Sequence, residues 1–302
     1  MMAGAARTAR LHGNDHVYEY ETSMKTELIS IPTPTTPLDG LWYQPDSGPS
    51  VGAALLFHGN TMNFYTGALR FLPPLLVQLG YSCLAFNRRG HDILSIRDNK
   101  DAAEGAAFQT YAEGVEDNRL AAQWVAARGF DAPVVIGHSN GGMLAVSHVL
   151  AHPKTPALVL LSAHRGETEA QRNPGGKPTA MTGSRAAEFE ATARAMVEAG
   201  RGRELMLFPG WWWAASAESY LDRISNMPSV LEQAPQVRCP VLYVRGDQEE
   251  RHMYPAEDFA ARSTGKTDVC IVPDCDHFYR RKEDEVGGIV ARWLGEHGPR
   301  AG

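Results

Sequence analysis

The sequence lacks long apolar segments and any excess of basic residues. No apolar run among its 302 residues approaches the roughly 20 that a membrane-spanning helix needs. The formal net charge is −6, from 29 basic and 35 acidic residues. Such a balance provides no positive field for a phosphate backbone. We therefore expect neither a membrane nor a nucleic acid as partner, and instead a small-molecule ligand.

Cysteine is scarce as well. The four cysteines are Cys83, Cys239, Cys270 and Cys275, and no two have CxxC spacing. This usage is typical of a reduced protein with buried thiols. Residues 1–23 include basic side chains but no following apolar core, so we interpret them as a flexible tail and not as a signal peptide. Together these absences predict a cytoplasmic protein.

What the sequence does contain is an alternation of strand-like and helix-like segments. The expected strands cover residues 25–31, 38–45, 51–59, 81–87, 132–138, 156–163, 239–247 and 268–274. The expected helices cover residues 67–80, 110–129, 140–152, 185–199, 215–224, 256–262 and 283–297. Pro73 and Pro74 lie inside the first of these helices, and we expect them to kink or restart it.

The order of these segments predicts the architecture. Strands and helices that alternate with short links indicate an α/β protein with a mostly parallel central sheet and helices on both faces. The alternation stops over residues 164–236, where helix-like stretches occur without a convincing strand. We therefore expect a core formed by residues 24–163 and 237–302. Residues 164–236 are expected to form an inserted helical cap over the carboxyl edge of the sheet.

A single serine occupies the tightest corner of this pattern. Residues 137–141 read Gly-His-Ser-Asn-Gly, between an apolar strand and an amphipathic helix. A reversal of one residue holds Ser139 in a strained conformation, and glycine neighbours keep the strand and the helix from colliding. The helix N-terminus then directs backbone N–H groups at an exposed hydroxyl. This context favours a nucleophile over a bystander serine.

A serine nucleophile needs a base, and the chain has 11 histidines. His277 follows the last expected strand, in a loop that returns to the carboxyl edge of the sheet above Ser139. We therefore predict that His277 is the base. His138 is expected to point away from the site, whereas His148 and His152 are interpreted as packing or surface residues.

The acid that orients His277 should follow a strand that lies between Ser139 and His277 in the chain. The loop after the strand at residues 239–247 offers Asp247, Glu249 and Glu250, and spacing alone does not separate them. Asp276 adjoins the histidine directly, and we expect it to point elsewhere.

The turn after the strand at residues 51–59 can complete an oxyanion hole. The backbone N–H of Asn60, or that of Thr61, can face Ser139 together with the N–H of Asn140. His58 is interpreted as a brace for this turn. No set of His, Asp or Glu residues has the spacing of metal ligands, so no metal is expected.

These features together resemble the α/β-hydrolase superfamily from about Val51 to Leu294, with the cap as the divergent part. The matching positions are the turn at 58–60, the loop at 86–92, the corner at 137–141, and the loops at 246–249 and 276–278. The chain order of serine, acid and histidine also agrees. In this family the acid often closes a Gly-x-x-Asp pattern. Glu249 occupies that position here, so the resemblance ranks Glu249 first and Asp247 second.

The resemblance implies hydrolysis of a carboxylic ester, lactone or amide through an acyl-enzyme. Ser139 would attack a carbonyl as His277 takes its proton, and the amides of Asn60 and Asn140 would hold the oxyanion. No cofactor is implied. The same residues also serve C–C bond hydrolases and acyltransferases, and the same fold serves ligand receptors, so the fold does not choose among them.

The cap segment contributes a run of aromatic residues. Trp211, Trp212 and Trp213 are adjacent and make up half of the six tryptophans in the chain. We expect at least one to face the cleft as an apolar wall, with Phe64 and Tyr65 opposite. The alternative is that the tryptophans pack the cap onto the core. The aromatic run favours a small apolar or aromatic substrate over a charged one.

Overall fold

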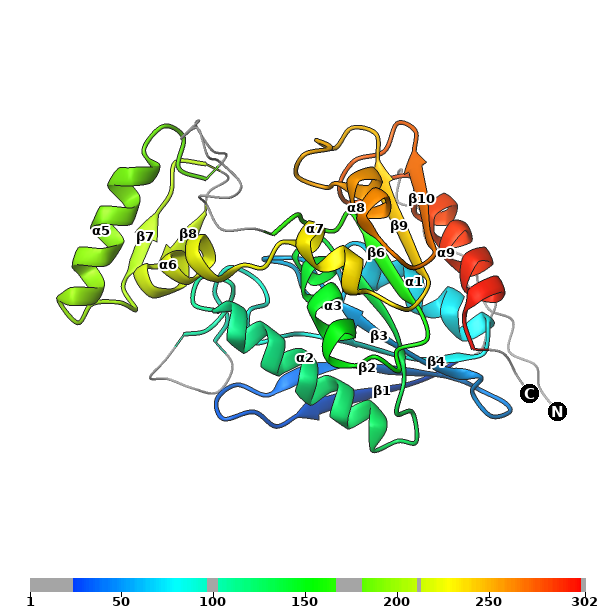
Figure 1. Ribbon diagram of the computed structural model, residues 1–302. Coiled ribbons are helices and arrows are strands. Elements are labelled where there is room, and N and C mark those ends of the chain that lie inside the picture. Colours follow the sequence, from blue (N-terminus) through cyan, green and yellow to red (C-terminus); the bar gives the residue numbers. More distant parts are fainter. Residues whose placement is uncertain (1–23, 97–102, 167–180, 211–212, 300–302) are drawn as a thin grey trace, which may run out of the picture.

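A single eight-stranded sheet forms the centre of the computed structural model, which describes residues 24–96, 103–166, 181–210 and 213–299 (Figure 1). Its strands are β1 (Met24–Ile31), β2 (Leu38–Pro45), β3 (Gly52–Phe57), β4 (Tyr81–Phe86), β5 (Val134–His138), β6 (Leu158–Leu161), β9 (Val241–Gly246) and β10 (Thr267–Val272). The spatial order is β1-β2-β4-β3-β5-β6-β9-β10. Only the β1–β2 and β2–β4 pairs are antiparallel. The predicted α/β class is confirmed; the expected tail at residues 1–23 lies outside the described residues.

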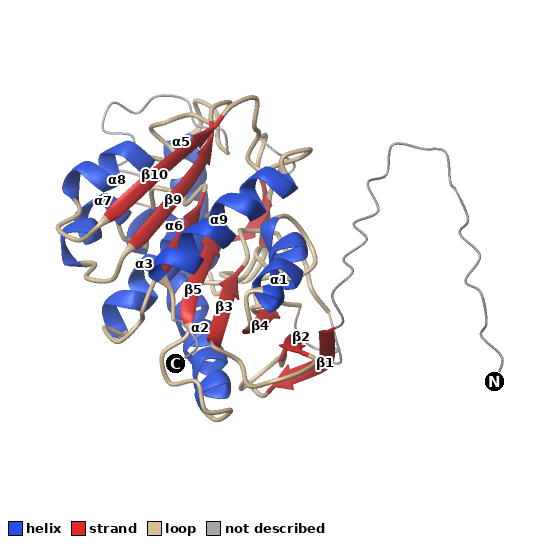
Figure 2. Cartoon of the chain, turned by 90° about the vertical axis from the view of Figure 1, so that its right-hand side faces the viewer, coloured by secondary structure: helices blue, strands red, loops and turns tan. Residues whose placement is uncertain are grey.

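Helices cover both faces of this sheet (Figure 2). One face carries α1 (Ala68–Gln78) and α9 (Glu283–His297), and the other carries α2 (Tyr111–Ala126), α3 (Asn140–Ala151), α7 (Val230–Gln233) and α8 (Ala256–Arg262). Each face has its own cluster of buried apolar side chains. None of the described helices is long and apolar enough to cross a membrane.

Helix α1 continues through Pro73 and Pro74, so the expected restart of this helix is wrong. A proline inside a helix costs about 3 kcal/mol. Burial of one leucine side chain contributes about 1.5–3 kcal/mol, and Leu69, Leu72 and Leu76 of this helix are all fully buried. Packing of this stripe against the sheet therefore offsets the cost of the prolines.

A capping box fixes the start of α2. The Thr110 hydroxyl accepts the Glu113 N–H, and the Glu113 carboxylate accepts the Thr110 N–H at 2.8 Å. Beyond the other end, Gly129 adopts a φ of 91°, which glycine tolerates without steric cost. The loop that leads into α2 is thereby held at a defined place beside the carboxyl edge of the sheet.

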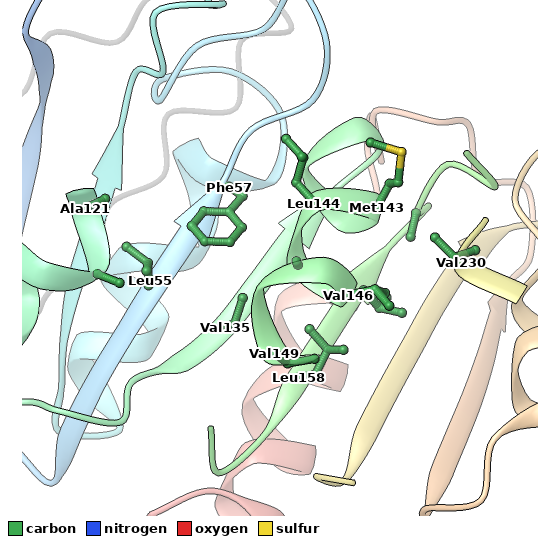
Figure 3. Close-up of a cluster of buried hydrophobic side chains, with 14 of the residues drawn as sticks. Leu55, Phe57, Ala121, Val135, Met143, Leu144, Val146, Val149, Leu158 and Val230 are labelled. Carbon is green, nitrogen blue, oxygen red and sulfur yellow. The ribbon is translucent and has the colours of Figure 1, made fainter. Parts of the chain in front are cut away.

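Helix α3 is the element that fixes the serine corner against the sheet. Figure 3 shows its side chains Val146 and Val149 beside Val135 of β5 and Leu158 of β6. All four are at least 95% buried. The apolar stripe holds the N-terminus of α3 at the carboxyl end of β5.

The inserted segment forms a lobe beside the core (Figure 1). It contains α5 (Ala186–Glu198), β7 (Leu205–Leu207), β8 (Ala214–Ser216) and α6 (Ala217–Asn226). The antiparallel β7–β8 pair corrects the expectation of an insertion without strands. Three residues per strand are too few to show an alternating pattern in the sequence. Helix α7 also falls within residues 164–236, but it packs on α3 through the buried Val230.

Hydrogen bonds attach this lobe to the first residue of α2 and to the loop before it. The N–H of Ser216 donates to the Ala107 carbonyl at 2.7 Å, and the N–H of Tyr111 donates to the Asp222 carboxylate at 2.6 Å. Since Asp222 lies on α6, these contacts bring α6 to the carboxyl edge of the sheet.

Phe57 provides a test of the core. Its ring is fully buried, edge-on to Phe86 at 6.1 Å and to His148 at 5.4 Å between ring centroids. We expect Phe57→Ala to lower the free energy of unfolding by about 3–5 kcal/mol, measured by urea denaturation. Leu28→Ala, at a side chain that is 75% exposed, should change it by less than about 0.5 kcal/mol. Equal losses in the two variants would contradict this description of the core.

Candidate active site

Ser139 forms the one-residue corner between β5 and α3. Its backbone has φ 56° and ψ −120°, and α3 begins at the next residue, Asn140. A Cβ atom on Gly137 would lie 2.4 Å from the Gly141 carbonyl oxygen, and one on Gly141 would lie 2.2 Å from the Phe57 carbonyl oxygen. Neither glycine can be replaced without moving backbone. A strained serine backbone costs about 1–3 kcal/mol, which the packing of α3 must offset.

The backbone N–H and carbonyl of Ser139 are hydrogen-bonded, but its hydroxyl is not. The Ser139 N–H donates to the Leu161 carbonyl at 2.9 Å, and its carbonyl accepts N–H groups from Gly142 and His164, each at 2.9 Å. Within the described part of the chain, nothing hydrogen-bonds to the hydroxyl, and the residue is partly exposed. The corner therefore presents an accessible Oγ on a fixed backbone.

His277 and Glu249 meet at the same edge of the sheet. His277 lies between β10 and α9, Glu249 follows β9, and the imidazole Nδ1 is 2.6 Å from the carboxylate Oε1. The Glu249 side chain is 3% exposed and that of His277 is 21% exposed. Because an ionised carboxylate only accepts hydrogen bonds, Nδ1 carries the proton. In the neutral ring, Nε2 then keeps the lone pair that a general base needs.

The other acids near His277 have different partners. An oxygen of Asp247 accepts the Cys275 N–H at 3.1 Å, and this hydrogen bond lowers the pKa of Asp247. An oxygen of Asp276 accepts the N–H groups of Phe278 and Arg280, each at 3.0 Å. Both carboxylates thus hold loop backbone, and Glu249 is the acid placed on the imidazole.

The His138 ring packs against the His277 ring, a contact that the sequence did not predict. The His138 Nε2 is 2.9 Å from the His277 carbonyl oxygen, and the two ring centroids are 4.9 Å apart. Full burial lowers the pKa of His138 to about 3. The ring is therefore neutral and donates its Nε2 proton to that carbonyl. Strand alternation indicates which face His138 occupies, but not which distant loop passes over it.

Two backbone donors flank the serine. A Cβ atom on Gly59 would lie 3.1 Å from the Ser139 Cβ, so the turn that contains Asn60 crosses the corner. Asn140 is the first residue of α3, where an N–H has no acceptor within the helix. Neither the N–H of Asn60 nor that of Asn140 donates to another described residue. Both remain available to a ligand.

His58 holds this turn in place. Its Nδ1 is 2.7 Å from the Gly59 carbonyl oxygen, and its Nε2 accepts the Arg88 N–H at 3.0 Å. Burial lowers the pKa of His58 well below its ordinary value. A neutral ring with Nδ1 protonated fits both contacts, as the expected brace requires.

A cleft opens next to the serine corner, and neither Ser139 nor His277 is among the residues that line it. Asn60 and Asn140 line it together with the apolar Met143 of α3 and the charged Asp222 and Arg223 of α6. The Arg223 guanidinium donates to the Asn60 side-chain oxygen at 3.4 Å. The cleft thus has a mixed lining, and the cap lobe contributes its charged side.

Of the predicted aromatic residues, the described Phe64, Tyr65 and Trp213 do not line this cleft. The centroids of the Phe64 and Tyr65 rings are 5.1 Å apart, and Tyr65 is 55% exposed. Trp213 packs against the apolar cluster of the cap lobe, with the Arg223 guanidinium 5.0 Å from its ring centroid. Trp211 and Trp212 lie outside the described residues. Within the described ranges, no group of three His, Cys, Asp or Glu residues could hold a metal ion.

The family follows from a match over most of the chain. A family model described as the alpha/beta hydrolase family matches residues 54–286. The chain belongs to the alpha/beta hydrolase family, and the protein is a hydrolase. This confirms the resemblance inferred from the motifs.

Solved structures agree in fold. Est1E from Butyrivibrio proteoclasticus, with ferulic acid bound, has a TM-score of 0.63 and 19% identity, covering 89% of this chain and 98% of its own. A thermostable carboxyl esterase from Bacillus coagulans has a TM-score of 0.67 and 16% identity, covering 91% and 99%. A dienelactone hydrolase from Anabaena variabilis has a TM-score of 0.56 and 14% identity, covering 91% and 98%. No curated protein sequence matches the chain.

Buried neutral histidines predict sensitivity to acid. Burial lowers the pKa of His138 and of His148 to about 3, from an ordinary value of 6.5. Below pH 6.5 the unfolded chain therefore binds protons that the folded chain does not, and stability falls as the pH drops from about 6.5 toward 3.

His148→Gln tests this dependence away from the serine corner. We expect the variant to lose stability less steeply between pH 7 and 5, by up to about 1.4 kcal/mol per pH unit, measured from urea midpoints. His252→Gln, at a side chain that is 66% exposed, should keep the slope of the original protein. Identical slopes for all three proteins would rule out the proposed contribution of His148.

Proposed function

We propose that this protein is a serine hydrolase that cleaves a carboxylic ester, lactone or amide through an acyl-enzyme. Ser139 is the nucleophile, His277 the general base and Glu249 the acid that orients His277. The observation that carries the proposal is the 2.6 Å contact between the His277 Nδ1 and the buried Glu249 carboxylate. Both loops return to the edge of the sheet at which the strained Ser139 corner lies.

The reaction follows from the protonation states. As the Ser139 Oγ attacks the carbonyl carbon, the His277 Nε2 takes the hydroxyl proton, and Glu249 stabilises the imidazolium. The N–H groups of Asn60 and Asn140 bind the oxyanion of the tetrahedral intermediate. His277 then protonates the leaving group. Water, deprotonated in turn by His277, releases the acyl group and restores the serine.

The residues that line the cleft indicate the polarity of the substrate. Its polar side at Asp222 and Arg223 and its apolar side at Met143 suit a small acyl group that carries a polar substituent. This revises the preference for a small apolar or aromatic substrate that the aromatic run suggested. The carboxyl esterase and the dienelactone hydrolase among the similar structures support an ester or a lactone as the bond to test first.

An activated Ser139 should react with a fluorophosphonate. We expect intact-mass analysis to find one adduct on the unsubstituted protein and none on Ser139→Ala, because only a serine with a base and an oxyanion hole attacks phosphorus rapidly. Hydrolysis of a short p-nitrophenyl ester should be lost in the same variant. An adduct of equal yield on folded Ser139→Ala would refute Ser139 as the nucleophile.

Substitution of the two candidate acids should lower kcat to very different extents. We expect Glu249→Gln to reduce kcat for the p-nitrophenyl ester by about 1,000- to 10,000-fold, since the amide no longer stabilises the imidazolium. Asp247→Asn, two residues away, is the matched control and should stay within about threefold of the original protein, because Asp247 accepts backbone N–H groups of the loops, such as that of Cys275, and does not contact the imidazole. The reverse order of effects would reassign the acid to Asp247.

A further inference from the structure

The Glu249 carboxylate has a second set of contacts on the oxygen that does not face His277. Its Oε2 accepts the Gly246 N–H at 2.8 Å and the Ser162 hydroxyl at 2.5 Å. The Ser162 Oγ is also 2.7 Å from the Tyr279 phenol oxygen. Ser162 and Tyr279 are fully buried, and Glu249 is 8% exposed. The mechanism above uses neither hydroxyl.

Counting protons gives this chain of hydroxyls a direction. Ser162 has one hydroxyl proton, and the carboxylate can only accept, so that proton lies between Oγ and Oε2. The Ser162 Oγ must then accept the proton of the Tyr279 phenol. Burial and the nearby charge of Glu249 raise the pKa of Tyr279 well above its ordinary value, so the phenol keeps its proton. Tyr279 therefore donates to Ser162 at 2.7 Å, in preference to the Val244 carbonyl at 3.4 Å, and Ser162 donates to Glu249.

Both hydroxyl residues have unusual backbones. Ser162 has φ 44° and Tyr279 has φ 60°, in the left-handed region that side chains other than glycine rarely occupy. Ser162 directly follows β6, and its N–H donates to the Val244 carbonyl of β9 at 2.8 Å. Tyr279 is two residues beyond His277. The contacts thus join the end of β6, the loop after β9 and the loop of the base.

We propose that Ser162 and Tyr279 form a positioning relay for Glu249, which turns its carboxylate so that Oε1 faces the His277 Nδ1. The relay deepens the proposed function and rests on it. A carboxylate held only through Oε1 could rotate about its last side-chain bond, whereas donors to Oε2 set that rotation. Neither hydroxyl touches the reacting atoms, so both act through Glu249.

Ser162→Ala tests the relay directly. We expect kcat for the p-nitrophenyl ester to fall roughly 10- to 100-fold, the value of one hydrogen bond to a charged group, with KM within about twofold. Tyr279→Phe should change kcat in the same direction by a smaller factor.

A matched control separates positioning from loss of a buried hydroxyl. Ser82 on β4 is also fully buried, and its hydroxyl contacts that of Ser50 at 2.6 Å. We expect Ser82→Ala to keep the original kcat. Melting followed by circular dichroism should show that all variants are folded at the assay temperature.

A double-mutant cycle provides the decisive readout. If Ser162 acts through Glu249, adding Ser162→Ala to Glu249→Gln should cause no further loss of kcat. The relay is overturned if Ser162→Ala keeps kcat within twofold, or if its loss is as large beside Glu249→Gln as alone. An inactive Ser139→Ala with a fully active Ser162→Ala would reject the relay alone. A fully active Ser139→Ala would reject the proposed function as well.

Discussion

The strained corner at Ser139 is the constraint on which the rest of the site depends. A serine at φ 56° between a strand and a helix is unfavourable by itself, and it persists because α3 packs tightly over β5 and β6. The apolar side chains of α3 and the close glycine contacts at Gly137 and Gly141 hold that position. One local conformation thereby exposes the Oγ and aims the N–H of Asn140 beside it.

The buried titratable groups around the corner are hydrogen-bonded to one another or to loop backbone. Low pKa values keep His58 and His138 neutral, and a ring nitrogen of each forms a hydrogen bond with a loop carbonyl. The buried Glu249 carboxylate, which contacts His277, receives donors on both oxygens. A buried charge is tolerated only when it is paired or hydrogen-bonded, so its donors also determine its orientation.

The cap lobe gives the site its second side. Because Tyr111 and Ala107 bond to Asp222 and Ser216 of the lobe, α6 is anchored to the first residue of α2 and to the loop before it. Arg223 of α6 then reaches the turn that carries Asn60. The cleft lined by Asn60 and Asn140 is therefore formed jointly by core and insertion, and the charged Asp222 and Arg223 come from the insertion.

The sequence by itself determined the features that depend on local pattern. Apolar runs and glycine spacing predicted the α/β class, the order of the elements and the corner at Ser139, because neighbouring residues set these. His277 also followed from its place after the last strand. The family resemblance ranked Glu249 above Asp247, but only the tertiary structure shows that Glu249 meets His277 and Asp247 meets Cys275. It likewise decided the contact between His138 and the His277 carbonyl, the β7–β8 pair and the packing of Trp213. Each depends on which distant segments meet in the folded chain.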